Sequence, residues 1–126
     1  MKYLLLVEDS SLLQERVLES VSEFSHALVT ECATKQDQAT ELLGQQRFDL
    51  LIADIELEEG NGFEVIRHAQ NTLPKDQWPV FIVLSNHVNF HYRKLAANLG
   101  IQYFFDKSMQ YDEAMEVAKQ ILDPYL

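Results

Sequence analysis

The chain has 126 residues, of which 47% are hydrophobic, and this size and composition indicate one domain with a packed core rather than a disordered segment. Its formal net charge of −10 argues against a nucleic-acid-binding surface, which requires clustered basic residues, and against docking to an anionic membrane. The one cysteine, Cys32, excludes an internal disulfide, and no apolar stretch reaches the length of a signal peptide or a membrane span, so we expect a cytoplasmic protein.

Five short apolar segments are typical of buried strands, and they alternate with segments in which hydrophobic residues recur at helical spacing. The strands are expected at residues 3–7, 27–31, 48–54, 80–84 and 101–105. Leu73-Pro74 ends the third helix, because a residue before proline avoids the helical conformation, and Gly100 follows the fourth. The last helix, at about residues 110–122, buries Ala114, Val117, Ala118 and Ile121. This alternation predicts an α/β fold, a doubly wound, flavodoxin-like parallel sheet of five strands in the order 2-1-3-4-5 with five helices.

The segment from Phe48 to Asp54 organises the rest of the chain. From Leu50 to Ala53 it is apolar without interruption, it ends in the Asp54 carboxylate, and a loop with Gly60 and Gly62 follows it. In open α/β sheets, ligands bind just beyond the carboxyl ends of the central strands. Asp54 therefore lies where chemistry is expected.

Polar residues also follow the other strands that end at this edge. They are Glu8 and Asp9 after the first strand, Ser85 after the fourth and Lys107 after the fifth. Three crowded carboxylates resist ionisation unless a cation neutralises them, and their oxygens suit a hard ion such as Mg²⁺. In such a site Asp54 can attack a phosphoryl group to give an acyl phosphate. Lys107 would then offset charge on the phosphoryl oxygens, and Ser85 would donate a hydrogen bond to one of them.

These pieces, taken together and in this order, resemble the receiver domain of two-component response regulators over essentially the whole chain. The matching pieces are Leu6-Val7-Glu8-Asp9-Ser10, Asp54-Ile55-Glu56-Leu57 with Gly62, Leu84-Ser85 and Phe104-Phe105-Asp106-Lys107. The resemblance implies that Asp54 accepts a phosphoryl group from a histidine kinase or a histidine phosphotransfer protein. It also implies that Mg²⁺ is held beside the acidic pair Glu8 and Asp9, by the carboxylates of Asp9 and Asp54 and the backbone carbonyl of Glu56.

The resemblance further implies a conformational switch. Ser85 matches the switch hydroxyl, Lys107 the phosphate-contacting lysine and Phe104 the aromatic switch position. Phosphorylation would reshape the surface of the fourth helix, fifth strand and fifth helix, which signals to an unidentified downstream protein and through which isolated receivers often form homodimers. On this reading residues 1–126 are a single receiver domain without an output domain. It would be a signalling module that binds neither nucleic acid nor membrane directly, and not an enzyme beyond its own phosphorylation and dephosphorylation.

Several residues depart from the family's pattern. Ser108 follows Lys107 where the family usually has proline, often with a cis peptide bond, so the turn is expected to be remodelled or strained. Glu58 also replaces a common proline, and Glu56 and His87 stand where the family tunes dephosphorylation.

Two other functions stay open at this point. The first is a pseudo-receiver that docks or dimerises independently of phosphorylation, which the missing proline and the acidic loop favour. The second is a phosphatase of the haloacid-dehalogenase type, which also forms an aspartyl phosphate. That family places Asp-x-Asp after its first strand, whereas this chain has Glu8-Asp9 and no cap domain.

Overall fold

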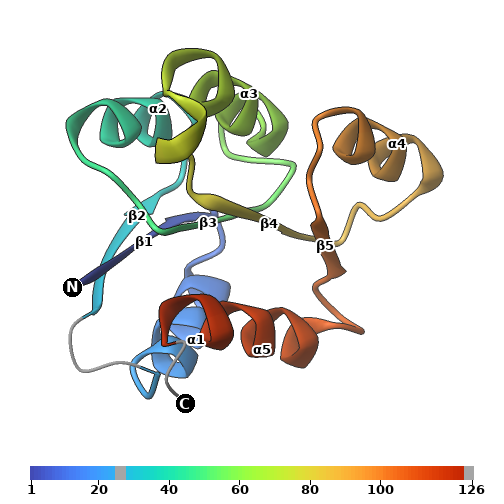
Figure 1. The fold of residues 1–126 in the computed structure, drawn as a ribbon. Helices are drawn as coiled ribbons and strands as arrows, with labels where there is room; N and C mark the ends of the chain where they lie inside the picture. Colours follow the sequence, from blue (N-terminus) through green and yellow to red (C-terminus); the bar gives the residue numbers. More distant parts are fainter. Residues whose placement is uncertain (25–27, 124–126) are drawn as a thin grey trace.

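The computed structural model describes residues 1–24 and 28–123. Within these residues, five strands form one parallel sheet in the order β2-β1-β3-β4-β5 (Figure 1). The strands are β1 (Lys2–Val7), β2 (Leu28–Ala33), β3 (Leu50–Ala53), β4 (Val80–Ser85) and β5 (Tyr103–Asp106). Their number, direction and order confirm the predicted fold class.

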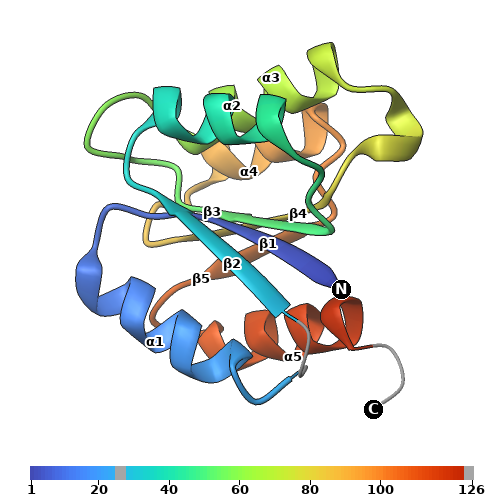
Figure 2. The ribbon, with the colours of Figure 1, turned by 90° about the vertical axis from the view of Figure 1, so that its left-hand side faces the viewer.

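Five α-helices connect and cover the strands in the described part of the chain. They are α1 (Ser11–Val21), α2 (Gln36–Gln45), α3 (Gly62–Thr72), α4 (Phe90–Asn98) and α5 (Tyr111–Leu122), with a short 3₁₀ turn, η1 (Lys75–Gln77). Helices α1 and α5 cover one face of the sheet, and α2, α3 and α4 cover the other (Figure 2). None of these helices is long and apolar enough to cross a membrane.

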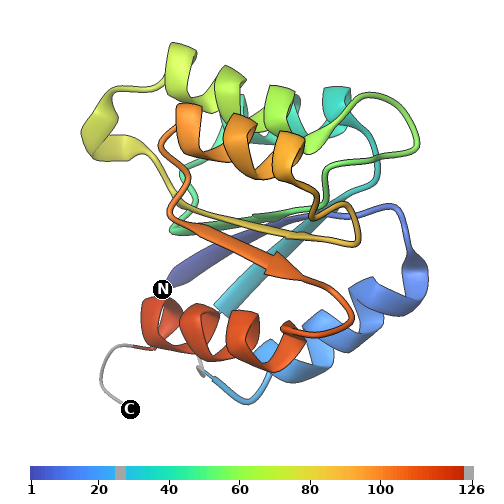
Figure 3. The same cartoon turned by 90° about the vertical axis from the view of Figure 1, so that its right-hand side faces the viewer.

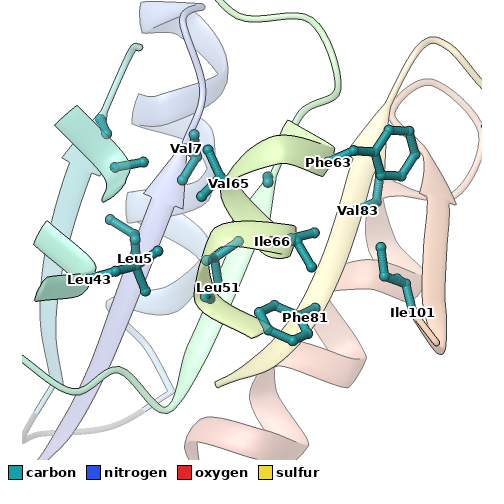
Figure 4. Packing of buried hydrophobic residues seen from close by; sticks show 14 of the residues in the cluster. Leu5, Val7, Leu43, Leu51, Phe63, Val65, Ile66, Phe81, Val83 and Ile101 are labelled. Atoms are coloured by element: carbon teal, nitrogen blue, oxygen red, sulfur yellow. The ribbon is translucent and has the colours of Figure 1, made fainter. Parts of the chain in front are cut away.

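The strands are apolar without interruption because successive side chains enter different cores. Leu4 and Leu6 of β1 pack in the core beneath α1 and α5, whereas Leu5 and Val7 pack in the core beneath α2 and α3. Figure 4 shows the second core, with Val65 and Ile66 of α3 among the strand residues. Both faces of β1 and β3 are thereby removed from water, which explains why these strands lack the alternation of a half-exposed sheet.

Most predicted boundaries lie within a few residues of those observed. Residue 27, the predicted start of the second strand, lies outside the described residues. Phe48 and Ile101 are buried as predicted, but they precede β3 and β5 rather than forming part of them. Leu73 adopts extended angles after α3, and Gly100 has a φ of +72° after α4, so both predicted helix ends are confirmed.

The buried face of α5 was predicted only in part. Ala114 and Ala118 are buried as expected, but Met115 and Leu122 complete the buried face. Val117 and Ile121, which were also predicted to be buried, are only partly buried against the same core. All of these side chains are hydrophobic, and α5 is rotated so that the stripe containing Met115 and Leu122 points at the sheet.

Candidate functional site

The loops that follow β1, β3, β4 and β5 gather at one edge of the sheet, on the right in Figure 3. Three carboxylates meet there, because parallel strands bring their carboxyl ends to a common edge. Glu8, Asp9 and Asp54 each offer an oxygen, and these oxygens lie within 4.8 Å of one another. Glu8 and Asp54 are buried, with 1% and 7% of their surface exposed, whereas Asp9 is exposed. The predicted acidic cluster is therefore present.

Lys107 joins this cluster from the end of β5. Its Nζ lies 2.6 Å from Glu8 Oε1 and 2.8 Å from Asp54 Oδ2. Burial alone lowers the pKa of the Lys107 ammonium, but its hydrogen bonds to Asp54 and Glu8 outweigh burial and raise the pKa above its usual 10.5. Lys107 is therefore a cation that two buried carboxylates hold in place.

Burial has a different effect on Glu8. It raises the pKa of this carboxyl above its usual 4.5, although hydrogen bonds from Lys107 and from the Ser10 amide oppose the shift. A buried carboxylate next to two others is electrostatically costly, and one ammonium does not balance three acids. Further positive charge at this edge would stabilise the ionised cluster.

Backbone amides fix the orientation of the two buried carboxylates. The Ile55 N–H donates to Asp54 Oδ1 at 2.7 Å, and the Ser10 N–H donates to Glu8 Oε2 at 2.9 Å. The Gln14 side chain reaches back from α1 and donates to the Glu8 carbonyl at 2.6 Å. The contact between the Gln14 side chain and the Glu8 carbonyl was not predicted.

Ser85 lies at the same edge but does not join the acidic cluster. It is fully buried, and its Oγ accepts a hydrogen bond from the His87 N–H at 3.1 Å. Its carbonyl accepts the Lys107 N–H at 3.0 Å, which connects the ends of β4 and β5. The backbone thus brings Ser85 next to Lys107 while its hydroxyl is directed at its own loop.

Glu56 and Phe104 lie outside the acidic cluster. The Glu56 carboxylate is directed at His87, with Oε2 3.0 Å from Nε2. The Phe104 ring is partly buried against the core beneath α2 and α3, and the Arg93 guanidinium lies 4.9 Å from its centroid. The cluster is therefore built from Glu8, Asp9, Asp54 and Lys107, and the side chains of Glu56 and Phe104 are not part of it.

The turn after Lys107 is built without proline. The described residues contain no cis peptide bond, so the Lys107–Ser108 bond is trans. Asp106 Oδ1 closes the turn by accepting the N–H groups of Ser108 at 2.8 Å and of Met109 at 3.2 Å. The Ser108 hydroxyl donates to Asn86 Oδ1 at 3.2 Å, across to the loop after β4. The turn is remodelled, as one of the two expectations for this departure stated, into an Asx-type turn.

The donor set fits a hard divalent cation. Glu8, Asp9 and Asp54 offer carboxylate oxygens that lie within 4.8 Å of one another, and hard cations such as Mg²⁺ prefer oxygen ligands. A cation there would also reduce the repulsion among the three carboxylates.

Sequence comparisons with known proteins match most of this chain to one family. A family model described as the response regulator receiver domain matches residues 4–119. The transcriptional regulatory protein CrdR of Helicobacter pylori is 30% identical over 113 residues, which cover 89% of this chain and 51% of that protein. The chain thus spans about half the length of the curated relatives it matches.

Two solved structures share the fold over nearly the whole chain. A CheY-like receiver domain protein from Methanospirillum hungatei has a TM-score of 0.83 at 18% identity, covering 98% of this chain and 95% of that one. A response regulator protein from Burkholderia pseudomallei, solved with a phosphorylated aspartic acid and a calcium ion, has a TM-score of 0.77 at 17% identity, covering 98% and 67%.

Proposed function

Because this chain belongs to the response regulator receiver family, we propose that it is a phosphorylation switch in which Asp54 accepts a phosphoryl group from a phosphohistidine of a kinase or phosphotransfer protein. One observation carries the proposal: Lys107 Nζ lies 2.8 Å from Asp54 Oδ2 inside a cluster of three carboxylates. A lysine held against the acceptor oxygen is in position to contact the phosphoryl oxygens that arrive there.

In the proposed step, one Asp54 oxygen forms a bond to phosphorus while the phosphorus–nitrogen bond of the donor histidine breaks. The electron pair of that bond stays on the imidazole, which then takes up a proton from solvent. Asp54 Oδ1 is held by the Ile55 N–H, and Lys107 would move from Oδ2 to a phosphoryl oxygen. These contacts orient the acceptor and offset the charge that is transferred to it.

Glu8, Asp9 and Asp54, with the Glu56 carbonyl, are the groups proposed to hold Mg²⁺. The ion would supply charge neutralisation for the phosphoryl oxygens. The three carboxylates support this assignment, because a single ammonium leaves their charge uncompensated.

The proposed output depends on Ser85 and Phe104. The Ser85 hydroxyl has its own loop amide as partner, so a new acceptor at Asp54 would compete for it. Its movement would shift the loop that leads into α4, and the Phe104 ring is proposed to follow. The changed surface of α4, β5 and α5 would then bind a partner protein or a second copy of the chain.

The two alternatives stated from the sequence make different predictions. A pseudo-receiver would bind its partner without taking phosphate, and the intact contact between Lys107 and Asp54 argues against that reading. The match to the receiver family favours a receiver over a haloacid-dehalogenase-type phosphatase.

The test is the intact mass of the protein after incubation with Mg²⁺ and acetyl phosphate. We expect a single phosphoryl adduct that hydroxylamine removes, and none on Asp54→Asn. Asp37→Asn is the matched control, because Asp37 is an exposed acid in the first turn of α2 that is not a member of the cluster, and its adduct should equal that of the wild type. Absence of the adduct with acetyl phosphate, together with no beryllofluoride complex in the presence of Mg²⁺, would support the pseudo-receiver.

A further inference from the structure

A cavity lies between α3 and α4, next to the loop that follows Asp54. Its volume is about 310 Å³. Its walls are apolar and aromatic, and come from Phe63 on α3 and from Tyr92, Leu95 and Leu99 on or next to α4. The Phe63 and Tyr92 rings are stacked, with centroids 6.1 Å apart. The helix that forms one wall is lightly buried, since Ala96 is the only fully buried residue of α4.

Charged groups surround the mouth of this cavity. Glu56 and Glu64 bring two carboxylates, and Arg67 brings one guanidinium, which Glu64 already engages at 3.0 Å. The Glu56 carboxylate is 63% exposed, and its neighbour at 3.0 Å is the His87 imidazole. The cavity therefore combines aromatic walls with an accessible carboxylate, which is a combination that recognises a cation carried on an apolar stem.

We infer that this α3–α4 cavity receives an arginine side chain of a partner protein, with its methylene groups against Phe63 and Tyr92 and its guanidinium on the Glu56 carboxylate. Three considerations favour an arginine side chain over other occupants of the cavity. The planar guanidinium stacks on aromatic rings and binds carboxylates in a bidentate manner, which an ammonium does not. The protein's net charge of −10 attracts basic partners. The volume is at the lower limit of small-molecule sites, roughly 300 Å³, and suits an inserted side chain better than a cofactor.

The cavity is continuous with the residues that hold Asp54. Ile55 lines the cavity, and its N–H is the group that orients Asp54 Oδ1. A guanidinium on Glu56 would also compete with His87, which sits on the loop after Ser85. An occupant would thus contact the loop that follows Asp54 and release His87, on the loop that follows Ser85, from Glu56. That last coupling step rests on the proposed function, whereas the binding of arginine does not.

The test follows backbone amide signals of ¹⁵N-labelled protein, without phosphodonor or divalent ion, during titration with N-benzoyl-L-arginine amide. We expect saturable shifts at Phe63, Leu95 and neighbouring amides. N-benzoyl-L-citrulline amide is the control ligand, because it has the same shape and no charge, and we expect it to bind about fivefold more weakly. Equal affinity for both ligands, or shifts that do not saturate or lie elsewhere, would overturn the inference.

Two matched variants test the role assigned to Glu56. Glu56→Gln should weaken the arginine ligand about fivefold, whereas Glu58→Gln, in the same loop but outside the cavity, should leave its affinity unchanged. Equal effects of the two substitutions would also contradict the inference, because a general loss of negative charge would then explain them.

A second readout separates this inference from the proposed function. The rate of adduct formation with acetyl phosphate is measured with and without saturating N-benzoyl-L-arginine amide. A protein that binds the ligand at the cavity but forms no adduct under any condition supports the cavity and refutes the phosphorylation switch. A protein that forms the adduct but shows no ligand-dependent shifts supports the phosphorylation switch and refutes the arginine-binding cavity.

Discussion

Gly62 lets the start of α3 lie against the backbone of Asp54, so Gly62→Ala is an informative substitution for the fold around Asp54. Gly62 is the first residue of α3, and its N–H donates to the Ile55 carbonyl at 2.9 Å. A Cβ at this position would overlap the Asp54 carbonyl oxygen and lie 3.0 Å from the Asp54 carbonyl carbon and 3.2 Å from Ala53 Cβ. Both neighbours belong to the backbone or to a methyl group, so neither can rotate away.

The expected cost follows from these contacts. Overpacking of a well-filled site typically costs about 1–3 kcal/mol, and the better helix propensity of alanine returns at most about 1 kcal/mol. We therefore expect Gly62→Ala to lower the free energy of unfolding by about 1–2 kcal/mol and the melting temperature by roughly 3–8 °C. Urea unfolding followed by circular dichroism measures the first quantity, and calorimetry the second.

Gly44→Ala is the matched control. Gly44 lies within α2, and a Cβ there would have no heavy atom within 4 Å, so alanine should stabilise the protein by about 0.5–1 kcal/mol. If Gly62→Ala proved as stable as the wild type, the close packing of α3 against the end of β3 would be refuted. Destabilisation by both substitutions would refute the reasoning from Cβ contacts more generally.

Three further predictions test other parts of the site and fold. Lys107→Met should lower the free energy of unfolding in urea by about 2–3 kcal/mol, because it leaves two buried carboxylates without their cation. Lys94→Met, at an exposed lysine, should change it by less than about 0.5 kcal/mol. Equal effects of the two substitutions would refute the buried ion pair. Burial raises the pKa of Tyr111 above its usual 10.0, so the folded state resists ionisation and stability should fall as pH rises through about 10. Tyr111→Phe should lose less stability than the wild type between about pH 8 and about pH 10.5, as measured by the midpoints of urea unfolding. An equal loss of stability in the two proteins would contradict the role of Tyr111. Ser108→Pro should lower the free energy of unfolding by about 1 kcal/mol, because it removes the N–H that donates a hydrogen bond to Asp106 Oδ1. Ser108→Ala keeps that N–H and should leave the free energy of unfolding nearly unchanged. Equal stability of the two variants in the same urea assay would refute this prediction.

Much of the site could be predicted from the sequence because the sheet is parallel and buried. A strand covered on both faces is an uninterrupted apolar run, so its end is sharp in the sequence at Val7, Ala53 and Leu84. Parallel strands bring these ends to one edge, which is why Glu8, Asp54 and Lys107 could be grouped before any contact between them was known. The grouping required only the topology, and the topology followed from the alternation of strands and helices.

The directions of side chains in loops could not be predicted in the same way. Glu56 is directed at His87, and the Ser85 hydroxyl accepts from a backbone amide, because loop conformation decides which partner is within reach. The face of α5 was partly missed for a related reason. Val117 and Met115 are both hydrophobic, and only packing against the sheet determines which one is buried.

The separation of the site residues along the chain has a consequence for synthesis on the ribosome. Lys107 and Asp54 are 53 residues apart, and the segment between them includes α3, β4 and α4. Until β5 has paired with β4, the emerging chain has three acids near one edge, no ammonium among them, and β4 as an unpaired edge strand. Such an edge is prone to pairing with another chain, and contacts this distant in sequence form slowly. The lysine–aspartate contact can therefore form only after β5 has emerged and paired with β4, which makes this ion pair a late product of folding.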